Sequence, residues 1–405
     1  MTNRVVITGL GNVCGLGIGV NDYWTALSEG YSAIKPLKAV EDDIKITSGS
    51  MVEGFQPEQY FSNDKLPLLD RFSQFAVLAA QESLDDSGLT GHGSLERAAA
   101  IIGTGCGGKQ TDEETYARLY KEGKTRAHPL TIPKGMPSAA ASSVSRYLGI
   151  KGPVFSVASA CASGAHAVSQ GRLMIQSGLV DVALVGGTDA PFTYGLLKAW
   201  EALRVVSNDT CRPFSRDRSG MVLGEGSGIL VLESERHARN RGARIYAELI
   251  GCGLSSDAGH ITRPDVGGIA LAMTRAIGDA GISVNRIDYI NAHGTGTVAN
   301  DLAETEAIHR VFGSHAKSLA ISSTKSMHGH ALGAASALEL IATVLAIYRG
   351  LLPPTANFTE ADEGCDLDYV PNRARKQQVN VALSNAFAFG GLNAVLVLSA
   401  WAEGC

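Results

Sequence analysis

The stretch Pro153-Val154-Phe155-Ser156-Val157-Ala158-Ser159-Ala160-Cys161-Ala162-Ser163-Gly164-Ala165-His166 has the pattern of a strand, a sharp turn and a helix. Its apolar start predicts a strand, and the small residues after Cys161 predict a sharp turn into a helix. A helix N-terminus favours a thiolate over a thiol, because unpaired N–H groups and the helix dipole stabilise negative charge. Cys161 is therefore either a nucleophile with room around its sulfur or a small cysteine buried in a strand-to-helix corner.

The same alternation of strand, glycine and small-residue helix recurs along the chain. Short buried strands that end in glycine turns are predicted at Val5–Ile7, Ile101–Ile102 and Val182–Val185. Helices that end on or near a glycine are predicted at Phe72–Ser87, Ala162–Gly178, Gly268–Gly281 and Ala334–Gly350. This alternation favours a layered α/β architecture.

A coarse internal symmetry divides the chain. Strand-rich glycine segments open at Arg4 and again near Ile245, and a third, Val379–Leu398, closes the chain. We expect two halves, residues 1–250 with the cysteine and residues 251–405 with the later motifs. No Pro/Ser/Gly linker separates them, so they are expected to share one packed body.

Composition excludes several classes of protein. The 405 residues include 19% charged and 45% hydrophobic ones, and the formal net charge is -5, which fits a globular protein that does not bind nucleic acid. The seven cysteines form no CxxC pair, so a disulfide scaffold is not expected. The reducing cytoplasm is the expected location. The apolar run Leu340–Tyr348 is about half of what a bilayer requires, so no membrane span is predicted.

Two further segments place histidines beside glycines. In Tyr289–Thr297 a predicted strand runs into a glycine-rich loop that begins at His293, a setting typical of working groups in α/β proteins. A histidine satisfied in the core, or a weak phosphate loop, is the alternative. In Ile321–Ala335, Lys325 and His330 precede a helix, where an imidazole tends to stay neutral and can donate to an oxyanion. A solvated basic turn, or a metal site with Cys161, remains open there.

The last segment, Leu383–Asn393, places Phe387 and Phe389 on either side of Ala388 before a Gly-Gly pair. It is either a glycine turn with core aromatics or a mobile flap whose backbone N–H points at a carbonyl.

Together these four segments resemble the elongating β-ketoacyl-acyl-carrier-protein synthases of the thiolase superfamily, and the resemblance covers nearly the whole chain. The segments Val5–Gly11, Arg212–Arg218 and Leu223–Gly226 also match. The resemblance implies a thiolase fold, five αβαβα layers built from two βαβαβαββ halves, and an obligate dimer.

The resemblance also implies a role for each matching residue. Cys161 would take an acyl chain from a carrier protein as a thioester. His293 and His330 would hold the malonyl thioester and stabilise the enolate left by decarboxylation, with Lys325 orienting the site around His330 electrostatically. The carbanion would attack the Cys161 thioester, and the backbone N–H groups of Cys161 and Phe389 would form the oxyanion hole.

Binding residues are implied in the same way. Thr295 and Thr297 match positions that bind the phosphopantetheine arm, and Phe389 matches a gate between the half-reactions. The expected partner is an acidic acyl carrier protein, and no metal or organic cofactor is implied beyond the phosphopantetheine on that carrier. Four basic residues match its docking face: Lys65, Lys124, Arg126 and Arg204.

Within the family, Val13–Gly17, Asp189–Pro191 and Leu197–Ala202 resemble the nodulation protein E branch and synthases of polyunsaturated chains. Departures from the family pattern are His328 for Thr, Ala388 for Gly and Leu392 for Thr, and the methyl of Ala388 is expected to restrict the flap. The small residues of Pro133–Ser142 lead to the hypothesis of a pocket for a long or rigid conjugated chain.

Other functions remain as alternatives. A thiolase would need a second cysteine in the C-terminal glycine loop, and none lies between Asn385 and Ala400. An initiating synthase would carry asparagine in place of His330. A non-catalytic chain-length partner would lack Cys161. The sequence leaves open a housekeeping or a specialised pathway, and a homodimer or a heterodimer with a chain-length-factor-like partner.

Overall fold

The stretch around Cys161 forms the predicted strand–turn–helix unit, made of β6 (Val154–Val157) and α6 (Ser163–Gln176). The structure is a computed structural model that describes residues 3–37 and 43–402. The other three predicted helices are present within two residues of their expected bounds, as α2 (Arg71–Ser87), α9 (Val266–Asp279) and α12 (Ala335–Arg349).

The main strands form two sets of five, and the spatial order of the strands is the same in both sets. The first set contains β1 (Val5–Cys14), β5 (Ala99–Gly103), β6, β7 (Val182–Asp189) and β8 (Gly226–Ser234). The second contains β9 (Ala247–Ser256), β10 (Tyr289–Asn291), β11 (Ala320–Ser322), β14 (Val381–Ala388) and β15 (Leu392–Ala400). The spatial orders β1-β8-β7-β5-β6 and β9-β15-β14-β10-β11 are the same when each set is numbered along the chain.

The two sets join where β1 pairs with β9, with Val6 opposite Glu248 and Ile7 opposite Ala247. The repeated order confirms the internal symmetry that the sequence indicated. Residue 250 lies inside β9, so a division placed at that residue would cut this strand.

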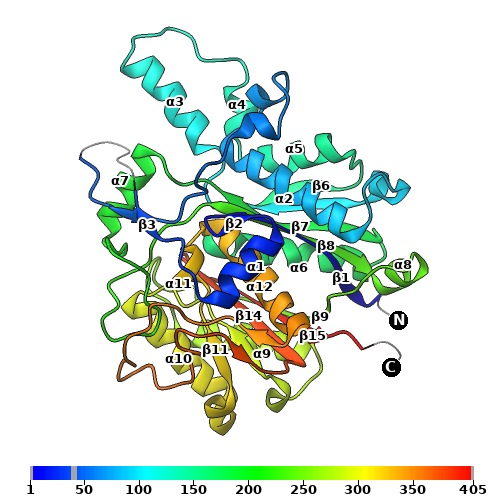
Figure 1. The fold of residues 1–405 in the computed structure, drawn as a ribbon, viewed down its shortest axis with the longest axis vertical. Helices are drawn as coiled ribbons and strands as arrows, with labels where there is room; N and C mark the ends of the chain where they lie inside the picture. The colour runs from blue at the N-terminus through cyan, green and yellow to red at the C-terminus, as the bar shows by residue number, and fades with distance from the viewer. Residues whose placement is uncertain (1–2, 38–42, 403–405) are drawn as a thin grey trace.

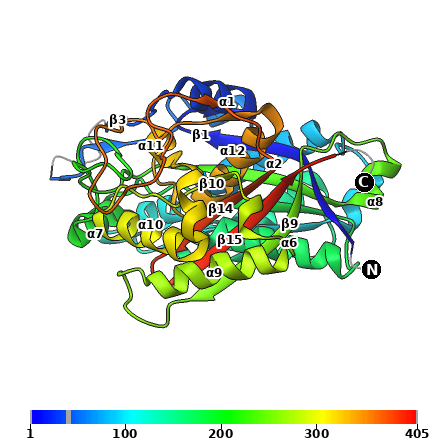
Figure 2. The same ribbon diagram turned by 90° about the horizontal axis from the view of Figure 1, so that it is seen from below.

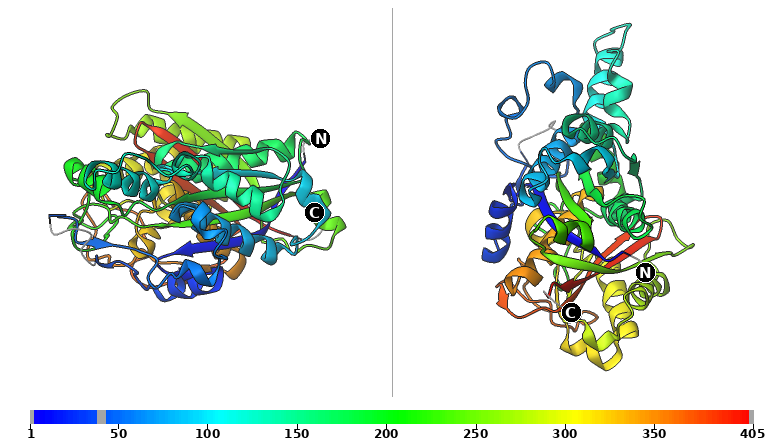
Figure 3. Two further views of the ribbon diagram at one scale, coloured as in Figure 1. Left: turned by 90° about the horizontal axis from the view of Figure 1, so that it is seen from above. Right: turned by 90° about the vertical axis from the view of Figure 1, so that its right-hand side faces the viewer.

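Helices complete five layers (Figures 1 and 3). The central layer contains α6 and α12, which pack against each other and against both sets of strands. Helices α2 and α5 (Ala139–Leu148) cover the outer face of the first set. Helices α9 and α10 (Val298–Phe312) cover the second, as Figure 2 shows from below. The predicted αβαβα arrangement is therefore confirmed.

The remaining α-helices and strands do not belong to the five layers. They are α1 (Val20–Glu29), α3 (Lys109–Tyr120), α4 (Thr131–Gly135), α7 (Tyr194–Leu203), α8 (Glu235–Asn240), α11 (Lys325–His328), and the short strands β2 (Gly17–Ile18), β3 (Lys35–Pro36), β4 (Ser48–Gly49), β12 (Leu351–Leu352) and β13 (Arg375–Lys376). Helix α3 extends away from the body (Figure 3).

Several glycines that were expected to end strands lie inside them instead. Strand β1 continues through Gly9 and Gly11, and β7 continues through Gly186 and Gly187. A Cβ at Gly11 would lie 1.9 Å from the carbonyl oxygen of Ala79 in α2. These glycines therefore allow close backbone packing, which a single sequence does not distinguish from a turn.

We expect Gly11→Ala to destabilise the fold by about 3 kcal/mol, because the added methyl overlaps the backbone of α2. The matched control is Gly278→Ala in α9, where an added Cβ meets nothing within 4 Å. That change should stabilise the protein by about 0.5 kcal/mol, since alanine favours helix. Urea unfolding of both variants measures the difference, and equal stabilities would contradict the packing argument.

The stretch Leu332–Arg349 is long and apolar enough to cross a membrane. The apolar run Leu340–Tyr348, from which no span was predicted, is only part of this stretch. However, 89% of the stretch is buried inside the fold, as is typical of the core helix of a globular protein. The six cysteines that the structure describes are free thiols; Cys405 lies outside the described residues.

Candidate active site

Cys161 lies on a strained turn between β6 and α6. The preceding residue, Ala160, has φ 50°, in the left-handed region that costs a non-glycine residue about 1–2 kcal/mol. Leu332 has φ 49° at the matching point before α12. The two equivalent turns of the two halves thus bring Cys161 and His330 to the same central layer.

His293 and His330 meet beside this turn. His293 follows β10 and His330 lies between α11 and α12, and their rings are 5.6 Å apart at 86°. Both side chains are buried, with 2% and 1% of their surface exposed. The alternative of a solvated basic turn around His330 is therefore wrong.

Hydrogen bonds set the tautomer of each imidazole. The ammonium group of Lys325 lies 3.2 Å from Nδ1 of His293, which must therefore accept. The backbone N–H of Leu332 donates to Nδ1 of His330 at 3.2 Å. Burial, and then the charge of Lys325, lower the pKa of both histidines well below the ordinary range. Each neutral imidazole therefore carries its proton on Nε2, as an oxyanion donor requires.

Lys325 lies at the start of α11 and is fully buried. It donates to the carbonyl oxygen of His293 at 2.6 Å and forms an ion pair with Glu339. The charge of Lys325 acts on His330, as the expected electrostatic role requires, and its hydrogen bonds additionally reach His293. Burial raises the pKa of Glu339 to about 7, against the opposing effect of Lys325.

The Cys161 side chain is buried at this turn. Burial raises its pKa to about 11, although the charge of Lys325 and the backbone N–H of Phe389 act in the opposite direction. Burial thus opposes the preference for a thiolate that the helix end predicts, because taking a charge out of water is costly. The backbone N–H of Phe389 contacts the Cys161 sulfur, so it lies close to the place that the carbonyl of an acyl group on this sulfur would occupy.

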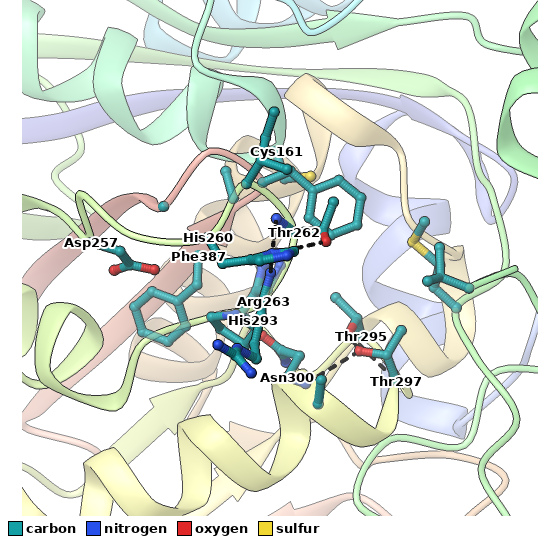
Figure 4. Close-up of a pocket in the computed structure, with 18 of the residues that line it drawn as sticks. Cys161, Asp257, His260, Thr262, Arg263, His293, Thr295, Thr297, Asn300 and Phe387 are labelled. Carbon is teal, nitrogen blue, oxygen red and sulfur yellow. Dashed lines mark hydrogen bonds between the residues drawn. The ribbon is translucent and has the colours of Figure 1, made fainter. Parts of the chain in front are cut away.

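Thr295 and Thr297 form the polar wall of the same cleft. Their hydroxyl groups lie 2.9 Å apart, and Thr297 caps α10 by accepting from the backbone N–H of Asn300. Gly294 and Gly296, with φ 36° and 78°, allow the loop to turn between β10 and this cap. Figure 4 shows the threonines, His293 and Cys161 around one opening.

A second cavity lies on the other side of Cys161. It has a volume of about 280 Å³ and a mainly apolar lining that includes Cys106, Leu196, Leu203 and Leu332. Three residues border both cavities: Cys161, Trp200 and Phe389. The rings of Trp200 and Phe389 lie 6.2 Å apart, so these aromatics separate the two spaces.

The β-ketoacyl synthase N-terminal domain matches residues 2–238, and its C-terminal domain matches residues 246–359. The chain belongs to the β-ketoacyl synthase family. It is 53% identical to nodulation protein E of Rhizobium sp. (strain N33), over 98% of this chain and 99% of that protein. It is 43% identical to 3-oxoacyl-[acyl-carrier-protein] synthase 2 of Coxiella burnetii, over 98% of each chain.

Solved structures agree with this family. The ishigamide ketosynthase/chain length factor superposes with a TM-score of 0.95 at 38% identity, over 99% of this chain and 100% of that one. A type II ketosynthase in complex with its acyl-carrier protein has a TM-score of 0.92 at 34% identity, with the same coverage. This β-ketoacyl synthase therefore has the thiolase fold and is a condensing acyltransferase.

The alkylation rate of Cys161 in this β-ketoacyl synthase should report its raised pKa. Below that pKa the thiolate fraction grows tenfold per pH unit, so alkylation by iodoacetamide should rise roughly 100-fold over two units above neutrality. Peptide mass spectrometry of the Cys161 peptide follows the rate. A plateau near neutral pH would show instead that the resting sulfur is a thiolate.

Two buried acids that sequence reasoning missed hold the loops around the cleft of the synthase. Glu304 accepts the backbone N–H groups of His293 and Gly294 at 2.9 and 2.8 Å. Asp189, noted in the sequence only as a branch marker, accepts from Gly105, Cys106 and Gly333. No local signal in the sequence marks either acid, because each becomes a loop anchor only through its tertiary partners.

The predicted docking residues and His328 line neither of the two cavities. Lys65, Lys124, Arg126 and Arg204 are exposed, and Lys65 lies over the ring of Tyr147. His328 is fully buried and bonds within its own loop. No residue of 133–142 lines the apolar cavity of the same chain. Among residues 3–37 and 43–402, no group of three or more His, Cys, Asp or Glu is arranged to hold a metal ion.

Proposed function

We propose that Cys161, His293 and His330 catalyse a decarboxylative condensation of acyl-carrier thioesters. The charge of Lys325 helps to keep the imidazoles of both histidines neutral. One observation carries this assignment: the imidazoles of His293 and His330 line the same buried cleft as Cys161, and the contacts at Nδ1 of each ring leave Nε2–H as the donor. That set can bind a thioester carbonyl and support a carbanion next to a nucleophile.

In the first half-reaction the Cys161 sulfur attacks the thioester of the acyl donor. The backbone N–H groups of Cys161 and Phe389 hold the oxyanion, and the pantetheine sulfur leaves as a thiol with the proton from Cys161. The acyl chain then enters the apolar cavity beside Cys161, because its lining offers hydrocarbon contacts.

In the second half-reaction the carbonyl of a malonyl thioester accepts Nε2–H bonds from His293 and His330. Loss of CO₂ leaves an enolate, which these two donors stabilise. Its carbon attacks the Cys161 thioester, and the bond to sulfur breaks. The products are a β-ketoacyl thioester and a Cys161 thiolate, which takes up one proton to restore the resting thiol. No metal or organic cofactor enters these steps.

We assign an acyl carrier protein as the partner that delivers both substrates. Its acidic surface would meet Lys65, Lys124, Arg126 and Arg204, and its phosphopantetheine arm would pass Thr295 and Thr297. A cytoplasmic location follows from this partner.

A second copy of the chain, or a chain-length-factor-like partner, would pair along β6. This strand ends the main sheet, so its outer edge has no partner strand within the described chain. Segment 133–142 of that second chain would then help to shape the acyl cavity. Specialised synthesis of a long or conjugated chain is the favoured pathway, given the greater identity to nodulation protein E. Housekeeping elongation, supported by the similarity to synthase 2, is the second candidate.

Intact-protein mass spectrometry tests the proposal. The enzyme is incubated with saturated and polyenoyl carrier thioesters, and malonyl carrier thioester is added to the acylated protein. We expect the mass to rise by one acyl group and to return to the unmodified value as a β-ketoacyl product forms. Acylation without condensation would refute the assigned histidine roles, and the preferred donor distinguishes the two pathways.

A further inference from the structure

We propose that Arg263 forms a phosphate subsite at the mouth of the catalytic cleft, and that it binds the phosphate of the phosphopantetheine arm. This inference rests on the proposed function, because both substrates would arrive on that arm. It assigns a binding role to a residue that the chemistry above does not use.

Arg263 lies in the exposed segment between β9 and α9 and lines the same cleft as Cys161 and His293 (Figure 4). Among the described residues, no carboxylate forms an ion pair with its guanidinium group. The nearest acids in sequence have other partners: Asp265 caps α9 through Gly268, and Asp257 accepts from Asn393 at 2.7 Å. The guanidinium is therefore free to bind an anion that enters the cleft.

The segment that carries Arg263 is braced. The backbone N–H of Arg263 donates to Nδ1 of His260 at 3.1 Å. The N–H of Gly390 donates to the carbonyl oxygen of Ile261 at 2.7 Å, which ties the segment to the Phe389 loop. The position of the Arg263 backbone is thus fixed relative to the nucleophile, and less ordering is needed when an anion binds.

From its buried end to its rim, the cleft presents groups that match the successive chemical groups of the phosphopantetheine arm. The buried histidines suit the thioester, and the threonine hydroxyls nearer the surface suit the amides. Arg263, on the exposed rim, suits the phosphate that follows the amides. The malonyl carboxylate is a less suitable anion, because only one carbon separates it from the carbonyl at the buried histidines.

The test compares thioesters with and without the phosphate. Wild-type enzyme, Arg263→Ala, Arg263→Lys and the control Arg310→Ala are assayed with acyl- and malonyl-phosphopantetheine and with the matching pantetheine thioesters. Arg310 is exposed on α10 and does not line the cleft. We expect Arg263→Ala to raise the KM of the phosphorylated thioesters roughly 3- to 10-fold, and this effect should shrink with added salt. Arg263→Lys should retain part of the affinity.

The KM of the pantetheine thioesters should not change in Arg263→Ala. Equal losses for both kinds of thioester, or a loss confined to malonyl substrates, would overturn the phosphate assignment. If wild-type enzyme turns over neither kind, the proposed function fails. Titration calorimetry with free phosphopantetheine and free pantetheine then decides the phosphate subsite separately: a preference for phosphopantetheine that Arg263→Ala removes supports it, and no such preference overturns it.

Discussion

Replacing Cys161 with alanine is expected to abolish acylation and to lower condensation by at least about 10³-fold, because the acyl chain loses its covalent attachment. The cavity beside Cys161 remains, so the variant should still fold and bind its carrier. Intact mass after incubation with the donor that loads wild-type enzyme best measures the first effect, and product formation measures the second.

The matched control is Cys252→Ala. Cys252 is a partly buried free thiol in β9 and lines neither of the two catalytic cavities. Acylation of this control should equal that of wild-type enzyme. Acyl transfer that persists in Cys161→Ala, with an added mass on another cysteine, would show that the nucleophile is not Cys161.

Replacing either buried histidine should separate the two half-reactions. In His293→Ala or His330→Ala one Nε2–H donor to the malonyl carbonyl is lost, and condensation should fall about 10²–10³-fold. Acylation of Cys161 should be nearly retained, because its oxyanion donors are backbone N–H groups. Rapid-quench assays with pre-acylated enzyme measure the second step alone.

His309→Ala provides a histidine control, since His309 pairs with Asp366 near the surface. Retained acylation in the two active-site variants also shows that they are folded. A parallel loss of acylation and condensation, at unchanged stability, would mean that the imidazoles activate the Cys161 thiol instead of the malonyl group.

The sequence pattern predicted the elements of this fold well, because hydrophobic periodicity and glycine caps are local signals. Helices α2, α9 and α12 follow from such signals, and the resemblance supplied the five-layer arrangement. The glycines inside β1 and β7 were misread, because only the packed structure shows the helix or strand that approaches them.

For the site, motif context identified Cys161, His293 and His330, whereas their protonation depended on burial. The helix end favours a thiolate, whereas full burial raises the pKa of the Cys161 thiol. The resemblance implied the electrostatic effect of Lys325 on His330, but it did not give the contact of Lys325 with His293, which lies 32 positions away in the chain. Glu304 and Asp189 could not be selected, because a lone carboxylate becomes a loop anchor only through its tertiary partners.

The central position of α12 ties catalysis to folding cooperativity. Nearly the whole helix is buried between the two sets of strands, so neither half can expose its sheet without losing the packing that places His330 beside Cys161. A partly unfolded molecule, with either half open, would therefore retain no fraction of the site. Activity lost during gradual denaturation should coincide with global unfolding, and the enzyme would present its partners with only two states, assembled or inactive.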